Sequence, residues 1–220
     1  MLKNGFEIVD NFISESELET ILLDTHHMNL QSRKGGIRNA EKIFTSIKHY
    51  SQSNSLKRIA SSYLDGADAN FVRAILFDKT PTNNWLVSWH QDKTIAVSQK
   101  FERQGWGPWS TKDNILHVQP PLEVLNKMIT FRIHLDASTQ GNGCLKIIAK
   151  SHEQGLLTQD EITQYVAAHE HEYCVAAKGS ALVMRPHSLH ASGKAKMPNR
   201  RRVLHMEFCG WELPQDVAWV

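Results

Sequence analysis

The chain has 220 residues, a common length for one β-barrel or β-sandwich domain, so we expect a single domain over residues 1–220. Its 25 basic and 23 acidic side chains give a formal net charge of +2, which is too nearly balanced to indicate a surface that binds nucleic acids or membranes. The three cysteines form no C-x-x-C pair, which argues against a disulfide framework or a thiolate zinc site and favours a reducing compartment. The chain starts without the apolar core of a secretion signal and has no run near the roughly 20 apolar residues that cross a bilayer. We expect a soluble, cytoplasmic protein.

Helix signals come first along the chain. Ser14 and Glu17 form a capping box, which predicts that a helix begins here. The glycine and polar content of residues 31–40 predicts a loop, and a second helix is expected from about Ser55 to Leu64. Both helices should pack on the outside of the sheets predicted further along.

From Asn70 onward, short apolar runs alternate with turn residues. This spacing favours an all-β sandwich or barrel over alternating βαβ units, so we predict a mainly β fold with flanking helices. The predicted strands cover residues 71–78, 84–90, 128–135, 143–148, 171–176, 180–185 and 201–209.

The most informative motif is His90-Gln91-Asp92, which follows the apolar run 85–89. Successive side chains of a strand point to opposite faces, so His90 and Asp92 project from one face and can share a ligand. His190, from a distant strand, would complete the two-histidine, one-carboxylate face that binds non-haem Fe(II) and leaves three coordination positions open. The motif therefore predicts an iron site formed by His90, Asp92 and His190, and with it an oxygenase.

A run of three arginines, Arg200 to Arg202, opens the apolar stretch that ends near Phe208. An iron oxygenase that uses 2-oxoglutarate needs a cation for the far carboxylate of this acid, and the planar fork of arginine suits it. Counting back from Phe208 favours Arg201 over Arg200 or Arg202, because a slip of one residue in a strand reverses the face.

Residues 93–122 form the longest stretch predicted to be irregular, and they contain Gly105-Trp106-Gly107-Pro108-Trp109. Loops of this length inside a compact domain are usually functional. Because the stretch begins directly after Asp92, it is placed to fold over the metal, with Trp106 or Trp109 as a wall of the substrate pocket. The alternative is a surface loop held by two buried tryptophans.

Strand alternation within residues 130–135 places Thr130, Arg132 and His134 on one polar face. If this face looks into the barrel, Arg132 would anchor a carboxylate or phosphate of the substrate. The alternative is a salt bridge within the barrel.

Other histidine groups are expected to lie outside the metal site. His187 and His190 would face opposite ways on a strand or turn, so His187 is interpreted as a neighbour of the site or a surface residue. His169-Glu170-His171 follows a predicted helix that begins near Asp160. His26-His27, at the end of the first helix, is expected to be solvated.

An ordered set of short motifs between residues 70 and 209 resembles the phytanoyl-CoA dioxygenase family. The set comprises Phe77-Asp78-Lys79, Asn84-Trp85, Trp89-His90-Gln91-Asp92, Leu135-Asp136, Gly141-Asn142-Gly143, Ser151-His152, His190-Ala191-Ser192-Gly193 and Arg201. The resemblance implies a double-stranded β-helix, the jelly-roll core shared with cupins, and one Fe(II)/2-oxoglutarate dioxygenase-like domain over residues 1–220. It also implies that His90, Asp92 and His190 bind the iron.

The same resemblance implies how the chain holds 2-oxoglutarate. Arg201 would pair with the distal carboxylate of the acid. Lys79, Ser192 and His152 match positions that help to hold it in some members of the family.

The reaction implied is the hydroxylation of an unactivated carbon of a small molecule by O₂, with release of succinate and carbon dioxide. Halogenation is disfavoured, because Asp92 fills the position that a halide would need, whereas desaturation and ring formation stay open. A third hypothesis is a non-catalytic jelly-roll protein with a binding or regulatory role. Only Arg200 to Arg202 suggest a nucleic-acid demethylase, and neither nucleic acid nor membrane is an expected partner.

Overall fold

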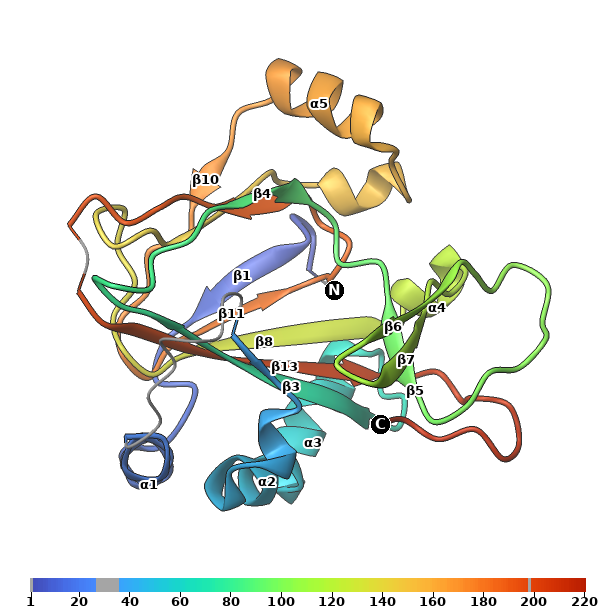
Figure 1. Cartoon of the computed structure of the whole chain (residues 1–220), viewed down its shortest axis with the longest axis horizontal. Coiled ribbons are helices and arrows are strands. Elements are labelled where there is room, and N and C mark those ends of the chain that lie inside the picture. The colour runs from blue at the N-terminus through green and yellow to red at the C-terminus, as the bar shows by residue number, and fades with distance from the viewer. Residues whose placement is uncertain (1, 27–35, 198) are drawn as a thin grey trace.

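The structure is a computed structural model that describes residues 2–26, 36–197 and 199–220, and it is mainly β (Figure 1). Its largest sheet consists of β1 (Phe6–Val9), β2 (Ile37–Arg38), β3 (Asn70–Lys79), β8 (Met128–His134), β11 (Ala181–Met184) and β13 (Arg201–Cys209). The strand order is β1-β11-β8-β13-β3-β2, and each neighbouring pair is antiparallel. The long strands β3, β8 and β13 lie side by side at its centre.

A smaller antiparallel sheet covers one face of the largest sheet (Figure 1). Its strands are β4 (Val87–His90), β9 (Leu145–Ile147), β10 (Glu172–Tyr173) and β12 (His190–Ser192), in the order β10-β9-β12-β4. The helix α5 (Gln159–Ala168) lies beyond this smaller sheet, and the short 3₁₀ helix η3 (Ser151–Gln154) precedes it.

Three helices cover the other face of the largest sheet: α1 (Glu15–Asp24), α2 (Thr45–Ser51) and α3 (Asn54–Tyr63). The capping box of Ser14 and Glu17 is present at the start of α1, and α3 agrees with the predicted second helix within one residue. The side chains of Ile129, Phe131 and Ile133 on β8 are fully buried in the core beneath these helices. The expectation that the helices pack outside the sheets is confirmed.

The stretch 93–122 differs from its prediction, because it is not irregular. It forms a third sheet from β5 (Ile95–Val97), β6 (Trp109–Lys112) and β7 (Ile115–Val118), in the order β5-β7-β6, and is followed by the short helix α4 (Leu122–Leu125). Asp113 and Asn114, both at positive φ, make the two-residue turn between β6 and β7, as such hairpins require. Valines of this sheet extend the core beside Val72 of β3.

Several short elements had no predicted bounds: β1, β2, α2, the 3₁₀ helix η2 (Ala40–Lys42), and β12, for which only the placement of His190 on a strand was expected. Of the predicted loop 31–40, residues 31–35 lie outside the described residues, and Ile37–Arg38 form β2. No described helix is long and apolar enough to cross a membrane.

Candidate metal centre

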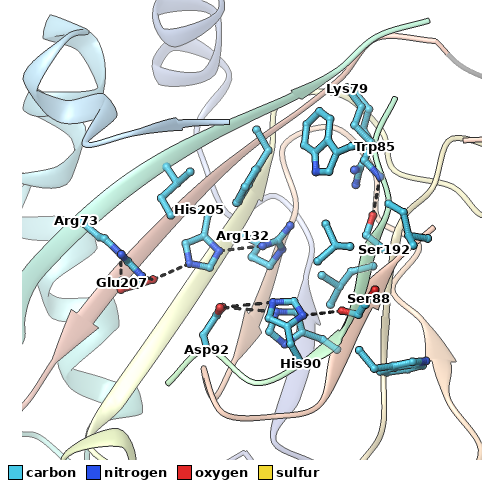
Figure 2. Close-up of a pocket in the computed structure, with 18 of the residues that line it drawn as sticks. Arg73, Lys79, Trp85, Ser88, His90, Asp92, Arg132, Ser192, His205 and Glu207 are labelled. Atoms are coloured by element: carbon cyan, nitrogen blue, oxygen red, sulfur yellow. Dashed lines mark hydrogen bonds and ion pairs between the residues drawn. The ribbon is translucent and has the colours of Figure 1, made fainter. Parts of the chain in front are cut away.

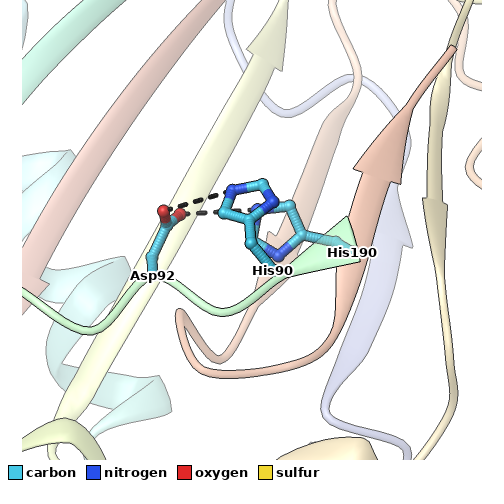
Figure 3. A group of neighbouring side chains, drawn as sticks. All are labelled: His90, Asp92 and His190. Atoms are coloured by element: carbon cyan, nitrogen blue, oxygen red, sulfur yellow. Dashed lines mark ion pairs between the residues drawn. The ribbon is translucent and has the colours of Figure 1, made fainter. Parts of the chain in front are cut away.

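Two histidines and one aspartate converge where β4 meets β12 (Figure 3). His90 is the last residue of β4, Asp92 follows two residues later, and His190 begins β12 as the register partner of His90. The Nε2 atoms of His90 and His190 lie 3.6 and 3.5 Å from the two carboxylate oxygens of Asp92. Potential ligand atoms of the three residues all lie within 4.8 Å of one another, and no other such group occurs within the described ranges.

Gln91 fixes the turn that carries His90 and Asp92. Its buried amide nitrogen donates hydrogen bonds to the carbonyls of Gly155 and His187, at 2.6 and 2.8 Å. The backbone N–H of Asp92 donates to the carbonyl of Pro186 at 3.0 Å. These bonds tie the His-Gln-Asp turn to the segment before β12, so residues about 100 positions apart in the sequence meet in a fixed arrangement. Sequence reasoning gave Gln91 no role.

Both histidine rings are oriented in the way that metal binding needs. The Nδ1 atoms of His90 and His190 lie 2.8 Å from the backbone carbonyls of Ser88 and Ser188. Because a carbonyl only accepts hydrogen bonds, each Nδ1 carries a proton, so that in the neutral form of either ring the lone pair is on Nε2, the atom that faces Asp92.

The charge states and spacing of the three residues suit a cation. Burial alone would raise the pKa of Asp92, but His190 and His90 outweigh it and hold this pKa well below its ordinary value. Burial, with His90 nearby, lowers the pKa of His190 and favours its neutral form, whereas Asp92 outweighs the effect of burial on His90 and raises the pKa of that ring. Ligands at right angles, each about 2.1 Å from a metal, lie about 3 Å apart, so only small shifts would bring these three residues onto one ion. The donor set fits a divalent transition metal with open positions.

The three residues border a cavity of about 520 Å³ between the two larger sheets (Figure 2). Trp85, Leu86 and Trp89 supply large apolar side chains on the β4 side, and Gln159 reaches the cavity from α5. The central strands of the largest sheet supply the opposite, polar wall.

The three consecutive arginines take three different positions. Arg200 and Arg202 form ion pairs with Asp78 and Asp136, both at 2.9 Å or less. Arg201 instead lines the cavity, is 3% exposed, and has no hydrogen-bond partner for its Nε. It forms no ion pair within the part of the chain that the structure describes. Of the three arginines, Arg201 is therefore the one that faces the cavity, on the strand face that the alternation indicated.

Lys79 and Ser192 meet beside Arg201. The Lys79 ammonium donates hydrogen bonds to the Ser192 hydroxyl at 2.9 Å and to the Gly193 carbonyl at 2.8 Å. Burial, together with Arg201 and Arg132, lowers the pKa of Lys79 to about 7. Burial and Arg132 also lower the pKa of Arg201, to about 10. Buried cations close together without a matching carboxylate are suited to bind an anion.

The polar face of β8 looks into the cavity, and Arg132 is one of its lining residues. Its Nη1 donates to His205 Nδ1 at 2.9 Å, and no carboxylate pairs with it among the described residues, so the alternative of a salt bridge is wrong. His205 in turn bonds Glu207, which pairs with Arg73. Sequence reasoning missed this network, although His205 and Glu207 share the strand face of Arg201.

Two predicted site residues lie away from the cavity. Trp106 packs against the core of the three-stranded sheet, with its ring 4.8 Å from that of Phe101. The stretch 93–122 folds to the side of His90, Asp92 and His190, which are called the metal group below. His152, on η3, faces Gly5, and its ring lies 6.1 Å from that of His187. Neither residue is among those that line the cavity, so the structure gives no support to the substrate-wall and cosubstrate roles expected from the sequence.

The remaining histidines lie outside the metal group, as expected. His187 is buried, and His169 stacks on Tyr165 at 3.8 Å between ring centroids. His171 contacts the ring of Trp89. Of the pair His26-His27, the second residue lies outside the described residues.

Two histidines and one carboxylate at the edge of a cavity between antiparallel sheets are the arrangement typical of non-haem iron oxygenases. Residues 1–203 match the family described as phytanoyl-CoA dioxygenase (PhyH), and the chain belongs to this family. Iron and 2-oxoglutarate are the cofactors of this class of enzyme. A comparison with curated proteins gives no match.

Solved structures share the fold over nearly the whole chain. AviO1 from Streptomyces viridochromogenes Tue57 is 18% identical with a TM-score of 0.71, over 97% of this chain and 92% of that one. SnoK, a non-haem alpha-ketoglutarate-dependent carbocyclase from nogalamycin biosynthesis, is 13% identical with a TM-score of 0.71, over 94% and 80%. HygX from Streptomyces hygroscopicus, with nickel and 2-oxoglutarate bound, is 9% identical with a TM-score of 0.66, over 94% and 82%.

Proposed function

We propose that this protein is an Fe(II)- and 2-oxoglutarate-dependent dioxygenase that hydroxylates an unactivated carbon of a small molecule and releases succinate and carbon dioxide. The observation that carries the proposal is the meeting of His90, Asp92 and His190, with the Nε2 atoms of both rings facing the carboxylate. In this proposal the two larger sheets are the two halves of a double-stranded β-helix, and all 220 residues form one domain.

His90, Asp92 and His190 would hold iron on one side and leave its other side open to the cavity. Iron, when bound with 2-oxoglutarate, supplies the oxidising chemistry that converts a C–H bond to C–OH with O₂. The chain's own task is to orient the reactants and exclude water. The Ser88 and Ser188 carbonyls serve that task, because they fix the rotation and the tautomer of both ligand rings.

Arg201, Lys79 and Ser192 would hold the distal carboxylate of 2-oxoglutarate. The guanidinium of Arg201 offers a planar pair of donors to a carboxylate, and its buried Nε has no hydrogen-bond partner among the residues that the structure describes. Lys79 adds a second positive charge, held in place by Ser192. In this position the acid would neutralise a cluster of buried cations.

The size and lining of the cavity support a small-molecule substrate. A volume of about 520 Å³ lies within the range of small-ligand pockets, and 2-oxoglutarate would fill part of it. The apolar side chains of Trp85, Leu86 and Trp89 would exclude water from the reacting carbon. Arg200 and Arg202, which suggested a nucleic-acid substrate, are instead paired with Asp78 and Asp136.

The test is an anaerobic titration with Fe(II) and 2-oxoglutarate, followed by absorption spectroscopy and by assay of succinate formation. We expect a charge-transfer band in the visible region with the wild-type protein. His190→Ala should weaken metal binding by about 10–100-fold or more, because it removes a ligand. His169→Ala is the matched control, since it removes an exposed histidine outside the group, and it should keep the band.

The titration and the succinate assay also distinguish the proposed dioxygenase from the alternative of a non-catalytic binding protein. Binding of both cosubstrates without any succinate formation would favour a non-catalytic binding protein. A wild-type protein that binds neither Fe(II) nor 2-oxoglutarate would disprove the proposed function.

A further inference from the structure

The side chain of Arg132 is a buried cation that faces the cavity and forms no ion pair with any residue that the structure describes. It lies in the middle of β8, is 8% exposed, and lines the cavity that also holds the metal group (Figure 2). Its guanidinium lies 5.2 Å from the ring centroid of Phe77. One nitrogen, Nη1, contacts His205, and within the described ranges Arg132 forms no ion pair.

The contact with His205 does not neutralise Arg132. Arginine only donates hydrogen bonds, so His205 accepts at Nδ1, and its Nε2 donates to a carboxylate oxygen of Glu207 at 3.0 Å. His205 is therefore a neutral ring between the two charged groups. It holds the guanidinium in place but brings it no negative charge.

Glu207 is already paired with another arginine. Nε and Nη2 of Arg73 donate to its two oxygens at 2.9 and 2.8 Å, in the bidentate geometry of a strong ion pair. The remaining nitrogen, Nη1 of Arg73, donates to His117 Nε2 at 3.0 Å. The negative charge of Glu207 thus balances Arg73, and the network Arg73–Glu207–His205 acts as a fixed support behind Arg132.

The cosubstrate of the proposed function would not balance Arg132 either. 2-Oxoglutarate has two carboxylates: one would bind at the metal with the keto group, and the other between Arg201 and Lys79. Asp92, the remaining carboxylate of the cavity lining, is in the metal group. Because a buried guanidinium without a counter-charge costs folding free energy, a bound anion is the simplest partner.

We propose that the substrate carries a carboxylate or phosphate group and that Arg132 binds this group. The inference rests on the proposed function and names its substrate class. The nitrogens of Arg132 not bonded to His205 offer the donors that such anions accept. The anionic end would lie against the polar wall of β8 and β13, and the rest of the molecule would face the tryptophans on the β4 side.

The experiment compares three ring compounds of similar size: phenyl phosphate, benzoate and the neutral benzamide. Each is titrated calorimetrically into the anaerobic wild-type protein loaded with Fe(II) and 2-oxoglutarate, while the charge-transfer band is monitored in the same sample. We expect phenyl phosphate or benzoate to bind at least about tenfold more tightly than benzamide, as a charge-assisted pair in a buried site would give.

Variants assign the effect to Arg132. Arg132→Gln should remove the preference for the anion, and Arg132→Lys, which keeps the charge but not the planar fork, should retain part of it. Arg200→Gln is the matched control, because it removes a cation that pairs with Asp78 outside the cavity lining, and it should bind the anions as the wild type does. A persistent band in Arg132→Gln shows that this variant is folded and loaded.

The outcomes separate the two proposals. If the band forms and benzamide binds as well as the anions, the substrate inference fails and the proposed function stands. If Arg132→Gln weakens 2-oxoglutarate as much as it weakens the anions, Arg132 belongs to the cosubstrate site and the inference fails. If the wild-type protein gives no band, the proposed function fails and takes the inference with it.

Discussion

The ammonium group of Lys79 lies in a buried corner between β3 and β12, close to two arginines. Burial and these arginines lower the pKa of Lys79 to about 7, from an ordinary value of 10.5. A carboxylate bound beside it would favour the charged form and raise this pKa again. Binding of 2-oxoglutarate above pH 7 would then take up a proton, which links its affinity to pH.

We expect the affinity for 2-oxoglutarate to be greatest below about pH 7 and to fall as the pH rises through the pKa of the free lysine. The fall would approach tenfold per pH unit until the pKa of the bound lysine is reached. Anaerobic titrations of metal-loaded protein between about pH 6 and about pH 9 would measure it. Lys79→Arg, which stays charged, should flatten the dependence. A wild-type affinity that is constant over this range would contradict a role for Lys79.

The local sequence pattern predicted the orientation of side chains that lie on regular strands. His90, Arg201 and Arg132 belong to strands whose alternation alone decides which face they occupy. Trp106 and His152 were misplaced because their position depends on how a loop and a 3₁₀ helix pack against distant segments. The sequence around these two residues contains no pattern that indicates which distant segments they contact.

At the scale of elements, length decided which strands the sequence could predict. The nine residues of β13 have the predicted bounds, because a strand of this length shows its alternation in the sequence: Leu204, Met206 and Phe208 all face the apolar core. β12 has only three residues, His-Ala-Ser, and forms through pairing with β4 and β9, so its own sequence predicts little. β5, β6 and β7 were hidden for the same reason, among glycines and prolines.

The N-terminal cap of helix α5 lies directly beside a residue that lines the cavity. The Thr158 hydroxyl accepts a hydrogen bond from the Glu161 N–H, and the Glu161 carboxylate accepts one from the Thr158 N–H at 2.8 Å. The next residue, Gln159, lines the cavity. The cap of α5 therefore fixes a residue at the cavity as well as the start of a helix.

We expect Thr158→Ala to lower the free energy of unfolding by about 1 kcal/mol, because it removes this cap. For a chain of this length the melting temperature should fall by about 2–4 °C, measured by circular dichroism. Ser14→Ala removes the same motif from α1, on the face of the largest sheet away from the cavity, and should cost a similar amount. Only Thr158→Ala should also slow 2-oxoglutarate turnover; equal turnover in both variants would contradict the link to Gln159.

At the scale of the whole molecule, the residues between the two larger sheets lower the stability of the fold, although the proposed function needs them. The helices and the largest sheet form an apolar core, whereas the other face of that sheet buries Lys79, Arg132 and Arg201. Buried cations without counter-charges destabilise the fold. A bound anion would offset this cost, which is consistent with an anion site between the two sheets. Ligands that supply those counter-charges should therefore stabilise the entire domain.

We expect Fe(II) and 2-oxoglutarate together to raise the melting temperature. At about 100 times its dissociation constant, a ligand that binds only the folded state adds about 2.7 kcal/mol, which corresponds to about 5–10 °C for a chain of this length. Anaerobic thermal unfolding would measure the increase, and a metal chelator should reverse it. Arg201→Gln should keep the increase caused by the metal but lose the part caused by 2-oxoglutarate, and His190→Ala should lose both. If 2-oxoglutarate stabilised Arg201→Gln as much as the wild type, Arg201 would not bind the acid, and the proposed cosubstrate site between the two larger sheets would be wrong.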